Sequence, residues 1–212
     1  MKIIQKGDHG PIFYIGSHEI IDDYINYIQG DHYLLVIFEV EDWNRDFSPW
    51  YALSPVGEPF LGGGKQTLAY LVDHIIQEVH QKYPAYHHDY ICGYSLAGLF
   101  ALWAYLDTDR FKGCVVSSAS LWFEGFMDYI QVHLPKKDTC IYLSLGGKEE
   151  KSKNQVMAQI GNLYRELYQK YKEDPDIRVT LKMNPGGHFT KTIERVCEGI
   201  SWILLQEKEN GN

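Results

Sequence analysis

The sequence has few cysteines and no hydrophobic run long enough to cross a membrane. Its four cysteines lie far apart and form no Cys-x-x-Cys pair, which excludes a zinc site of paired cysteines and a disulfide framework and predicts buried thiols. The N-terminus lacks the apolar stretch of a secretion signal, so we expect a cytoplasmic protein with no membrane partner. The cysteines are Cys92, Cys114, Cys140 and Cys197.

Positive charge is also scarce. The chain has 20 Lys and Arg against 28 Asp and Glu, a formal net charge of -8, and no basic stripe interleaved with aromatic residues. Nucleic-acid binding needs clustered cations at the phosphates, so we expect no nucleic-acid partner. The 212 residues contain no repeat, low-complexity tract or Pro/Ser-rich linker, which predicts one domain over residues 1–212. A homo-oligomer is compatible with this composition.

The glycine-rich segment LGGGKQT, residues 61–67, has some features of a phosphate-binding loop. The pattern G-x-x-x-x-G-K-(S/T) requires a glycine where Pro59 stands and a hydroxyl where Gln66 stands. We interpret the segment as a flexible loop before a helix. We expect no nucleotide, no metal and no other cofactor.

Apolar runs rich in β-branched and aromatic residues alternate with helical patterns along the chain. The runs are continuous rather than strictly alternating, which favours strands covered on both faces. Their alternation with helices predicts an α/β fold, with a mostly parallel central sheet and helices on both faces. The predicted strands are 11–16, 33–40, 90–94, 113–118, 139–146 and 177–183, with His87 and His88 in the loop before the third; the predicted helical stripes lie within 68–79, 156–171 and 193–204.

Ser95 lies between a predicted strand and an apolar helix, in the segment YICGYSLAGLFALWAYL. A strand-to-helix turn this tight holds its central residue in strained geometry and needs small neighbours, which Gly93 and Ala97 supply. Gly98 lets the helix pack close to the sheet. Reactive groups gather at the carboxyl ends of parallel strands, so we interpret Ser95 as a nucleophile. A serine that only caps the helix is the alternative.

A nucleophilic serine needs a base, and the base needs an orienting acid. Of nine histidines, His188 follows a predicted strand on a Pro-Gly-Gly turn, which can present the ring over the sheet edge. The acid should follow the strand 139–146, where Glu149 comes after a glycine turn and Glu150 is its alternative. The opposing interpretations are a surface-loop histidine and two glutamates that belong to the charged run KEEKSK.

The motifs together resemble the enterochelin esterase-like and esterase D-type putative esterases, a branch of the α/β-hydrolase superfamily. The similarity lies in GYSLAGLFALWA (93–104), SSASLWF (117–123), LGGKEEK (145–151) and NPGGHF (184–189), in the same order as in that branch, and more loosely in WNRDFSPW (43–50). The resemblance implies an α/β-hydrolase fold and a triad of Ser95, Glu149 and His188. The sequence departs from the G-x-S-x-G pattern at Ala97.

In this fold two backbone N–H groups stabilise the oxyanion of the reaction. One belongs to the residue after the nucleophile, here Leu96. The other should come from residues 41–43, with Glu41 as the assigned candidate. Trp43, Trp50 and Trp122 are candidates for an aromatic substrate pocket, with core packing as the alternative.

These features predict a serine hydrolase that cleaves small-molecule carboxylic esters through an acyl-enzyme. Two alternatives stay open: a non-catalytic binding module with the same fold, and an acyltransferase or thioesterase on the same scaffold. A panel of acyl esters, thioesters and catecholate lactones would distinguish them.

Overall fold

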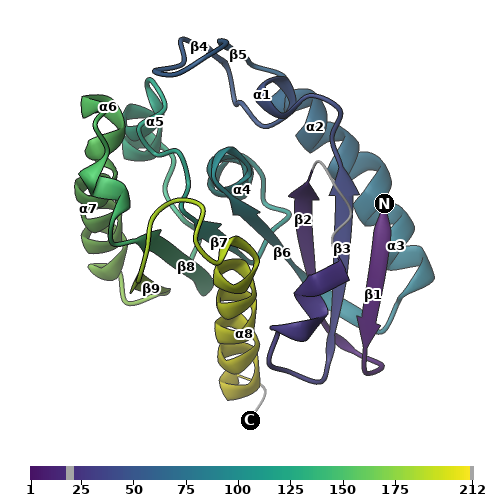
Figure 1. Cartoon of the computed structure of the whole chain (residues 1–212). Helices are drawn as coiled ribbons and strands as arrows, with labels where there is room; N and C mark the ends of the chain where they lie inside the picture. The colour runs from purple at the N-terminus through teal and green to yellow at the C-terminus, as the bar shows by residue number, and fades with distance from the viewer. Residues whose placement is uncertain (18–21, 211–212) are drawn as a thin grey trace.

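A seven-stranded sheet runs through the middle of the molecule in the computed structural model, which describes residues 1–17 and 22–210 (Figure 1). The strand order is β1-β3-β2-β6-β7-β8-β9, and only β1 is antiparallel to its neighbour. The predicted mostly parallel sheet is therefore confirmed. The strands are β1 (Lys2–Lys6), β2 (Gly10–Ser17), β3 (Tyr33–Glu39), β6 (Tyr86–Tyr94), β7 (Gly113–Ser117), β8 (Thr139–Gly146) and β9 (Ile177–Asn184).

The prediction is wrong at two places in this sheet. β6 begins at Tyr86, so His87 and His88 lie inside the strand and not in a preceding loop. β1 was not predicted because it is an edge strand whose Lys2 and Lys6 interrupt any apolar run. The irregular start of β6, where the register with β2 shifts between Gly10 and Ile12, hid the first residues of this strand from the apolar pattern.

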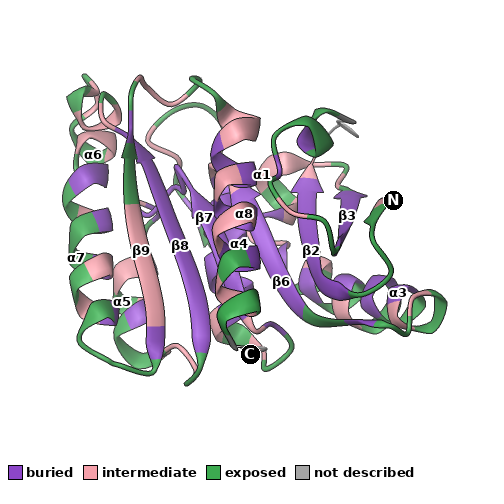
Figure 2. Cartoon of the chain, turned by 90° about the horizontal axis from the view of Figure 1, so that it is seen from below, coloured by how far each residue is buried: buried purple, intermediate pink, exposed green. Residues whose placement is uncertain are grey.

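Helices cover both faces of the sheet, as predicted, but unequally. One face carries α2 (Gly64–Tyr70), the π-helical segment η2 (Leu71–Ile76), α3 (Gln77–Lys82), α4 (Leu96–Asp107), α5 (Phe126–Val132) and α7 (Ile160–Lys172). The other face carries α8 (Thr192–Asn210), which lies across the sheet in Figure 2, and the short 3₁₀ helix η1 (Asp22–Asn26). The remaining short elements are α1 (Trp43–Asp46), β4 (Tyr51–Ala52), β5 (Phe60–Leu61), η3 (Glu149–Lys151) and α6 (Gln155–Ala158).

The amphipathic patterns explain how these helices pack. Val196, Ile200 and Ile203 of α8 are buried against the sheet, as the predicted stripe requires. α4 is buried on all sides from Leu96 to Tyr105, because it lies between the sheet and the outer helices. Val156 departs from its predicted stripe, because it belongs to the separate helix α6 and is exposed.

The glycine-rich segment 61–67 is packed and not a free loop. Gly63 N–H donates to Arg45 O and Gly64 N–H donates to Ser48 O, both at 2.8 Å. A Cβ on Gly63 would lie 2.9 Å from Arg45 O, so close backbone contact accounts for this glycine. α2 then begins at Gly64, as the predicted following helix requires.

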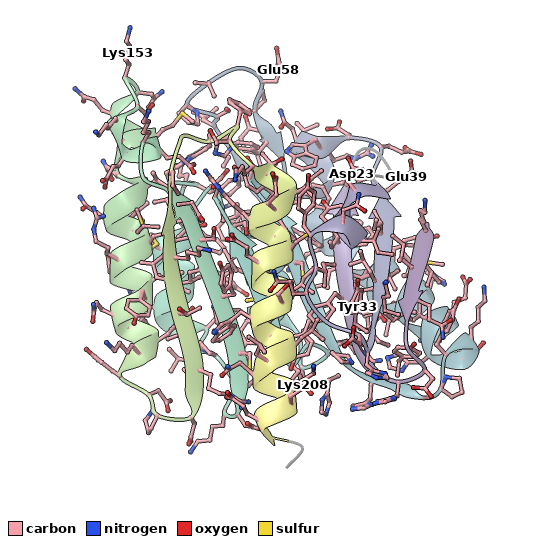
Figure 3. All side chains as sticks on the ribbon, turned by 60° about the horizontal axis from the view of Figure 1, so that its bottom comes forward. Asp23, Tyr33, Glu39, Glu58, Lys153 and Lys208 are labelled. Atoms are coloured by element: carbon pink, nitrogen blue, oxygen red, sulfur yellow. The ribbon has the colours of Figure 1, made fainter. Side chains whose placement is uncertain are left out.

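The two edges of the sheet carry different elements. Glu58 and Lys153 mark the loops above the carboxyl edge of the parallel strands, whereas Tyr33 and Lys208 lie toward the opposite edge (Figure 3).

No helix in the described part of the chain has the length and apolarity needed to cross a bilayer. The cysteines are buried free thiols, as predicted: Cys92, Cys114, Cys140 and Cys197.

Candidate active site

Ser95 occupies the turn between β6 and α4 with a strained backbone. Its φ is +58° and its ψ is -123°, a conformation that L-residues rarely adopt. A Cβ on Gly93 would lie 2.0 Å from Ala97 O, and a Cβ on Gly98 would lie 3.1 Å from Ala119 Cβ. The small residues around the serine are therefore needed by the turn itself.

Hydrogen bonds fix the Ser95 backbone to the neighbouring strand. Its N–H donates to Ser117 O at 3.0 Å, and its carbonyl accepts from Leu99 N–H and Ser120 N–H at 3.1 and 3.2 Å. The Oγ is left to point into the space above the sheet edge, where it lines two cavities.

The structure brings Ser95, His188 and Glu149 together from the ends of β6, β9 and β8. His188 Nε2 lies 3.0 Å from Ser95 Oγ, and His188 Nδ1 lies 2.8 Å from Glu149 Oε2. An ionised carboxylate only accepts hydrogen bonds, so the proton of a neutral imidazole belongs on Nδ1. Nε2 is then an acceptor for the serine hydroxyl proton.

The side chain of Glu149 is buried, with 6% of it exposed. Its Oε1 accepts hydrogen bonds from Ser118 Oγ at 2.7 Å, Gly146 N–H at 2.8 Å and Arg195 Nη1 at 3.2 Å. Burial raises the pKa of Glu149, but the hydrogen bonds from His188, Ser118 and Gly146 outweigh it and hold the pKa below its usual range. The carboxylate is therefore ionised at neutral pH.

The neighbouring Glu150 points elsewhere. Its carboxylate pairs with Arg165 Nη2 of α7 at 2.8 Å, and both side chains are partly exposed. The structure thus places Glu149, the predicted acid, next to His188 and its alternative Glu150 next to Arg165.

Arg195, which was not predicted to lie near these residues, contacts Glu149 and Ser118. It is 1% exposed near the start of α8, and its Nη1 donates to Ser118 Oγ at 2.9 Å as well as to Glu149. Its Nη2 donates to Gly187 O at 3.0 Å, in the loop that carries His188. One guanidinium therefore connects the carboxylate to the imidazole's own loop. The sequence offered one indication of this buried position. Arg195 is a charged residue directly before Val196, within the apolar stripe predicted over 193–204.

Tyr94 supports the same loop from β6. Its hydroxyl donates to the carbonyl of His188, and its ring lies 5.4 Å from the imidazole. His188 is thus held by Tyr94 at its backbone and by Glu149 at its ring.

The two predicted oxyanion donors have different positions. Leu96 opens α4, and the first N–H groups of a helix have no acceptor within the helix. The N–H groups of Glu41 and Asp42 both donate to Asp46 Oδ2, at 3.1 and 3.0 Å. Glu41 lines neither cavity at Ser95, whereas Trp43 lines both. The structure therefore does not bring Glu41 to the site.

Two cavities meet at Ser95 and His188. The larger, of about 530 Å³, extends toward Trp122, Phe60 and Met157, with Lys148 and Lys151 also in its wall. The smaller, of about 350 Å³, extends between Tyr94 and Tyr24 on the other side of the serine. Trp43 and Phe189 line both cavities and lie where the two meet.

The predicted tryptophans divide between pocket and core. Trp43 and Trp122 line the larger cavity. Trp50 packs its ring 5.6 Å from Phe123, and its Nε1 donates to Glu124 O at 3.0 Å. Trp50 therefore follows the core-packing alternative.

Comparisons with known proteins agree with this architecture. A family model described as putative esterase matches residues 15–173, which include Ser95 and Glu149. No curated protein sequence matches the chain.

Solved structures resemble the chain over most of its length at low sequence identity. An IroE-like serine hydrolase from Shewanella oneidensis has a TM-score of 0.81 at 16% identity, covering 96% of this chain and 74% of its own. The siderophore hydrolase EstA from Aspergillus nidulans has a TM-score of 0.72 at 15% identity, covering 94% and 84%. The enterobactin esterase FES from Shigella flexneri has a TM-score of 0.67 at 15% identity, covering 98% and 55%. These similarities confirm the α/β-hydrolase fold.

Proposed function

The chain belongs to the putative esterase family, and from this premise we propose that it is a serine hydrolase that cleaves carboxylic esters with Ser95, His188 and Glu149 as its triad. The observation that carries the proposal is the line of contacts from Ser95 Oγ through both nitrogens of His188 to Glu149, at 3.0 and 2.8 Å. A positioned base next to a serine, itself oriented by an acid, is the arrangement that nucleophilic catalysis needs. One continuous sheet from β1 to β9 supports a single domain.

The proposed reaction proceeds in two acyl-transfer steps. Ser95 Oγ attacks the ester carbonyl carbon while its proton passes to His188 Nε2. The tetrahedral intermediate then breaks the bond to the alcohol oxygen, which leaves with the proton from Nε2, and an acyl-enzyme remains. Water attacks the acyl carbon, again giving its proton to Nε2, and the acid product leaves as Ser95 regains the proton. Glu149 keeps the imidazole oriented and stabilises its cation throughout.

The oxyanion of each intermediate requires donors on one side of the serine. We assign the first donor to Leu96 N–H at the start of α4. The second was expected within residues 41–43, and we assign it to Trp43, because this residue lines both cavities at Ser95 and Glu41 lines neither. Removing one such donor typically costs about 3 kcal/mol of transition-state stabilisation.

Two cavities on opposite sides of Ser95 suit an ester, which has one group on each side of its carbonyl. The larger cavity, lined by Trp43, Trp122 and Phe60, fits the bulkier group, and the smaller fits the other. Because some structural neighbours are named as siderophore hydrolases, siderophore esters belong among the candidates.

The proposal is tested by combining a substrate panel with covalent labelling. p-Nitrophenyl acetate and butyrate, acyl thioesters and catecholate lactones are offered to the purified protein, together with a fluorophosphonate probe. We expect ester turnover and one probe adduct, which mass spectrometry locates on Ser95. Thioester turnover without ester turnover would favour the thioesterase alternative. The absence of both turnover and labelling would favour the non-catalytic binding module.

Arg195→Met should lower kcat by about 10- to 100-fold with little change in KM. Arg195 contacts Glu149 and not the cavities, and a hydrogen bond to a charged group is worth about 1.5–3 kcal/mol. Arg195→Lys, which keeps the cation, should recover part of the loss. Arg165→Met is the matched control, because Arg165 pairs with the neighbouring Glu150 and with Asn162. Equal losses in the Met variants, or a change in KM alone, would contradict a positioning role.

A further inference from the structure

A second cluster of reactive side chains lies at the opposite edge of the sheet from Ser95. His87 and His88 of β6 and Glu207 of α8 each offer one metal-binding atom, and these atoms all lie within 4.8 Å of one another. His88 Nδ1 lies 2.9 Å from Glu207 Oε2, and Tyr90 OH donates to the other carboxylate oxygen. The glutamate is therefore fixed, with 15% of its side chain exposed, whereas both imidazoles reach solvent.

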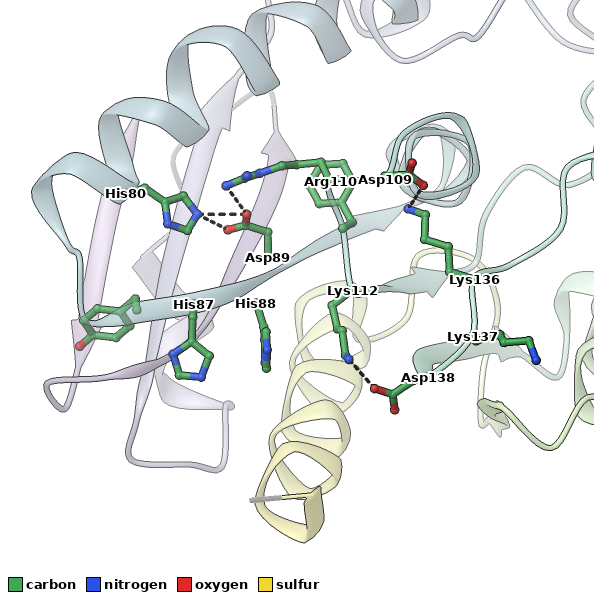
Figure 4. Close-up of a pocket in the computed structure, with 12 residues that line it drawn as sticks. His80, His87, His88, Asp89, Asp109, Arg110, Lys112, Lys136, Lys137 and Asp138 are labelled. Atoms are coloured by element: carbon green, nitrogen blue, oxygen red, sulfur yellow. Dashed lines mark hydrogen bonds and ion pairs between the residues drawn. The ribbon is translucent and has the colours of Figure 1, made fainter. Parts of the chain in front are cut away.

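An irregular backbone brings the two imidazoles together. Adjacent residues of a regular strand point to opposite faces, but His88 has a φ of +59° at the place where β6 loses register with β2. As a result the rings of His87 and His88 lie 4.6 Å apart and project from the same side of the strand (Figure 4). A left-handed histidine costs energy, and such strain is often found at functional sites.

Ion pairs lie beside the cluster. Lys112, at the same edge, pairs with Asp138 at 2.6 Å (Figure 4). Arg178 pairs with the same carboxylate at 3.1 Å. Asp138 therefore offsets part of the positive charge that would repel a metal ion. A cavity of about 400 Å³ lined by His87, His88, Lys112 and Asp138 leaves room for water at the open side.

We propose that His87, His88 and Glu207 bind a divalent transition-metal ion of the Zn²⁺ type. Two imidazole nitrogens and one carboxylate oxygen form a donor set that suits Zn²⁺, with water in the remaining position. Zinc–nitrogen distances are about 2.1 Å, so two ligands of one ion lie no more than about 4.2 Å apart. Both imidazole rings are exposed, so rotation of their side chains can bring the nitrogens within this distance of one another and of the Glu207 carboxylate. Tyr90 holds that carboxylate in place.

The metal would connect two distant parts of the fold. Glu207 lies at the end of α8 and the histidines at the start of β6, 119 residues before it in the case of His88. The neighbouring Lys208 marks this end of the helix in Figure 3. α8 carries Arg195 near its other end, so the ion would hold the helix that supports Glu149 without touching the reacting atoms.

A further group of candidate ligands, which we call the Asp8 cluster, provides an internal comparison. It consists of Asp8, His9 and His32. Its donor atoms also lie within 4.8 Å of one another, but all three residues are exposed and Asp8 is 87% exposed. His9 and His32 stack at 4.2 Å in the turns before β2 and β3. This cluster lacks the anchored carboxylate, so we expect it to bind a metal ion more weakly.

The test uses the full chain without an affinity tag, treated with a chelator and titrated with Zn²⁺ by isothermal calorimetry at neutral pH. We expect one tight site per chain and a rise in Tm, because an ion that binds only the folded state stabilises it. His88→Asn keeps a residue that tolerates the left-handed backbone, and His87→Gln and Glu207→Gln change the other ligands. Each should weaken binding at least about tenfold. His32→Gln and the exposed His74→Gln should retain it.

Two results would overturn the metal site. One is no heat of binding at submillimolar Zn²⁺ in the folded wild type. The other is binding that survives His88→Asn and His87→Gln but is lost in His32→Gln, which would move the site to the Asp8 cluster. Co²⁺ absorption spectra and circular dichroism of each variant separate loss of a ligand from loss of the fold. Ester hydrolysis is measured independently, so a failed esterase proposal leaves this test unchanged.

Discussion

Ser95→Ala is expected to abolish ester hydrolysis while the fold remains. The change removes only the Oγ, which contacts His188, and leaves the backbone bonds to Ser117, Leu99 and Ser120 in place. Loss of the serine from a triad typically lowers kcat by about 10⁶-fold. Turnover of p-nitrophenyl butyrate and fluorophosphonate labelling measure the effect, and the Tm measures the fold.

Ser118→Ala provides the matched control for the serine prediction. Ser118 also lines the larger cavity, but its hydroxyl donates to Glu149 and is not next to the imidazole Nε2. We expect this variant to react with the fluorophosphonate and to retain turnover at a reduced rate. If purified Ser95→Ala still turned over ester, or if only Ser118→Ala lost the label, Ser95 would not be the nucleophile.

Glu149→Gln should lower kcat by about 10⁴-fold, whereas Glu150→Gln should have little effect. Only Glu149 contacts His188, and an amide in its place no longer stabilises the imidazolium or selects the Nδ1–H tautomer. The corresponding change from carboxylate to amide in a serine protease triad has that size. Glu150 pairs with Arg165 near the surface, where a single ion pair contributes little.

Steady-state kcat and KM of the two glutamate variants provide the measurement. The substitutions are chemically identical but differ in burial, so the Tm of each variant is measured to separate a loss of stability from a loss of catalysis. Equal and mild losses in the two variants would mean that another group orients His188.

The sequence could predict the turn that carries Ser95, because the close backbone contacts of this turn require small neighbouring residues. A Cβ on Gly93 would overlap the backbone of Ala97, so this steric requirement is visible in the residues next to Ser95. The parallel sheet was predictable for a similar reason, since strands buried on both faces appear as continuous apolar runs.

Features that depend on packing between distant segments could not be predicted in this way. The sequence favoured Glu149 but left Glu150 as its alternative, because the direction of each side chain depends on the turn after β8. Arg195 reaches the acid from a separate helix, and no local pattern records that contact. The Glu41 amide was predicted as an oxyanion donor. The short helix α1 places Asp46 beside this amide, which donates to the Asp46 carboxylate instead.

The unequal covering of the sheet has a consequence for how the chain folds. Most helices pack on one face, whereas the other depends on α8, whose Val196, Ile200 and Ile203 cover an apolar surface that includes Phe13 and Tyr90. During synthesis this surface stays open until residues 192–210 have left the ribosome, and so does the space that Arg195 fills beside Glu149. Before α8 docks, the nascent chain therefore exposes an apolar face of the sheet, and Glu149 lacks its contact with Arg195. Docking of α8 would bury the aggregation-prone face and complete the surroundings of Glu149 in the same event.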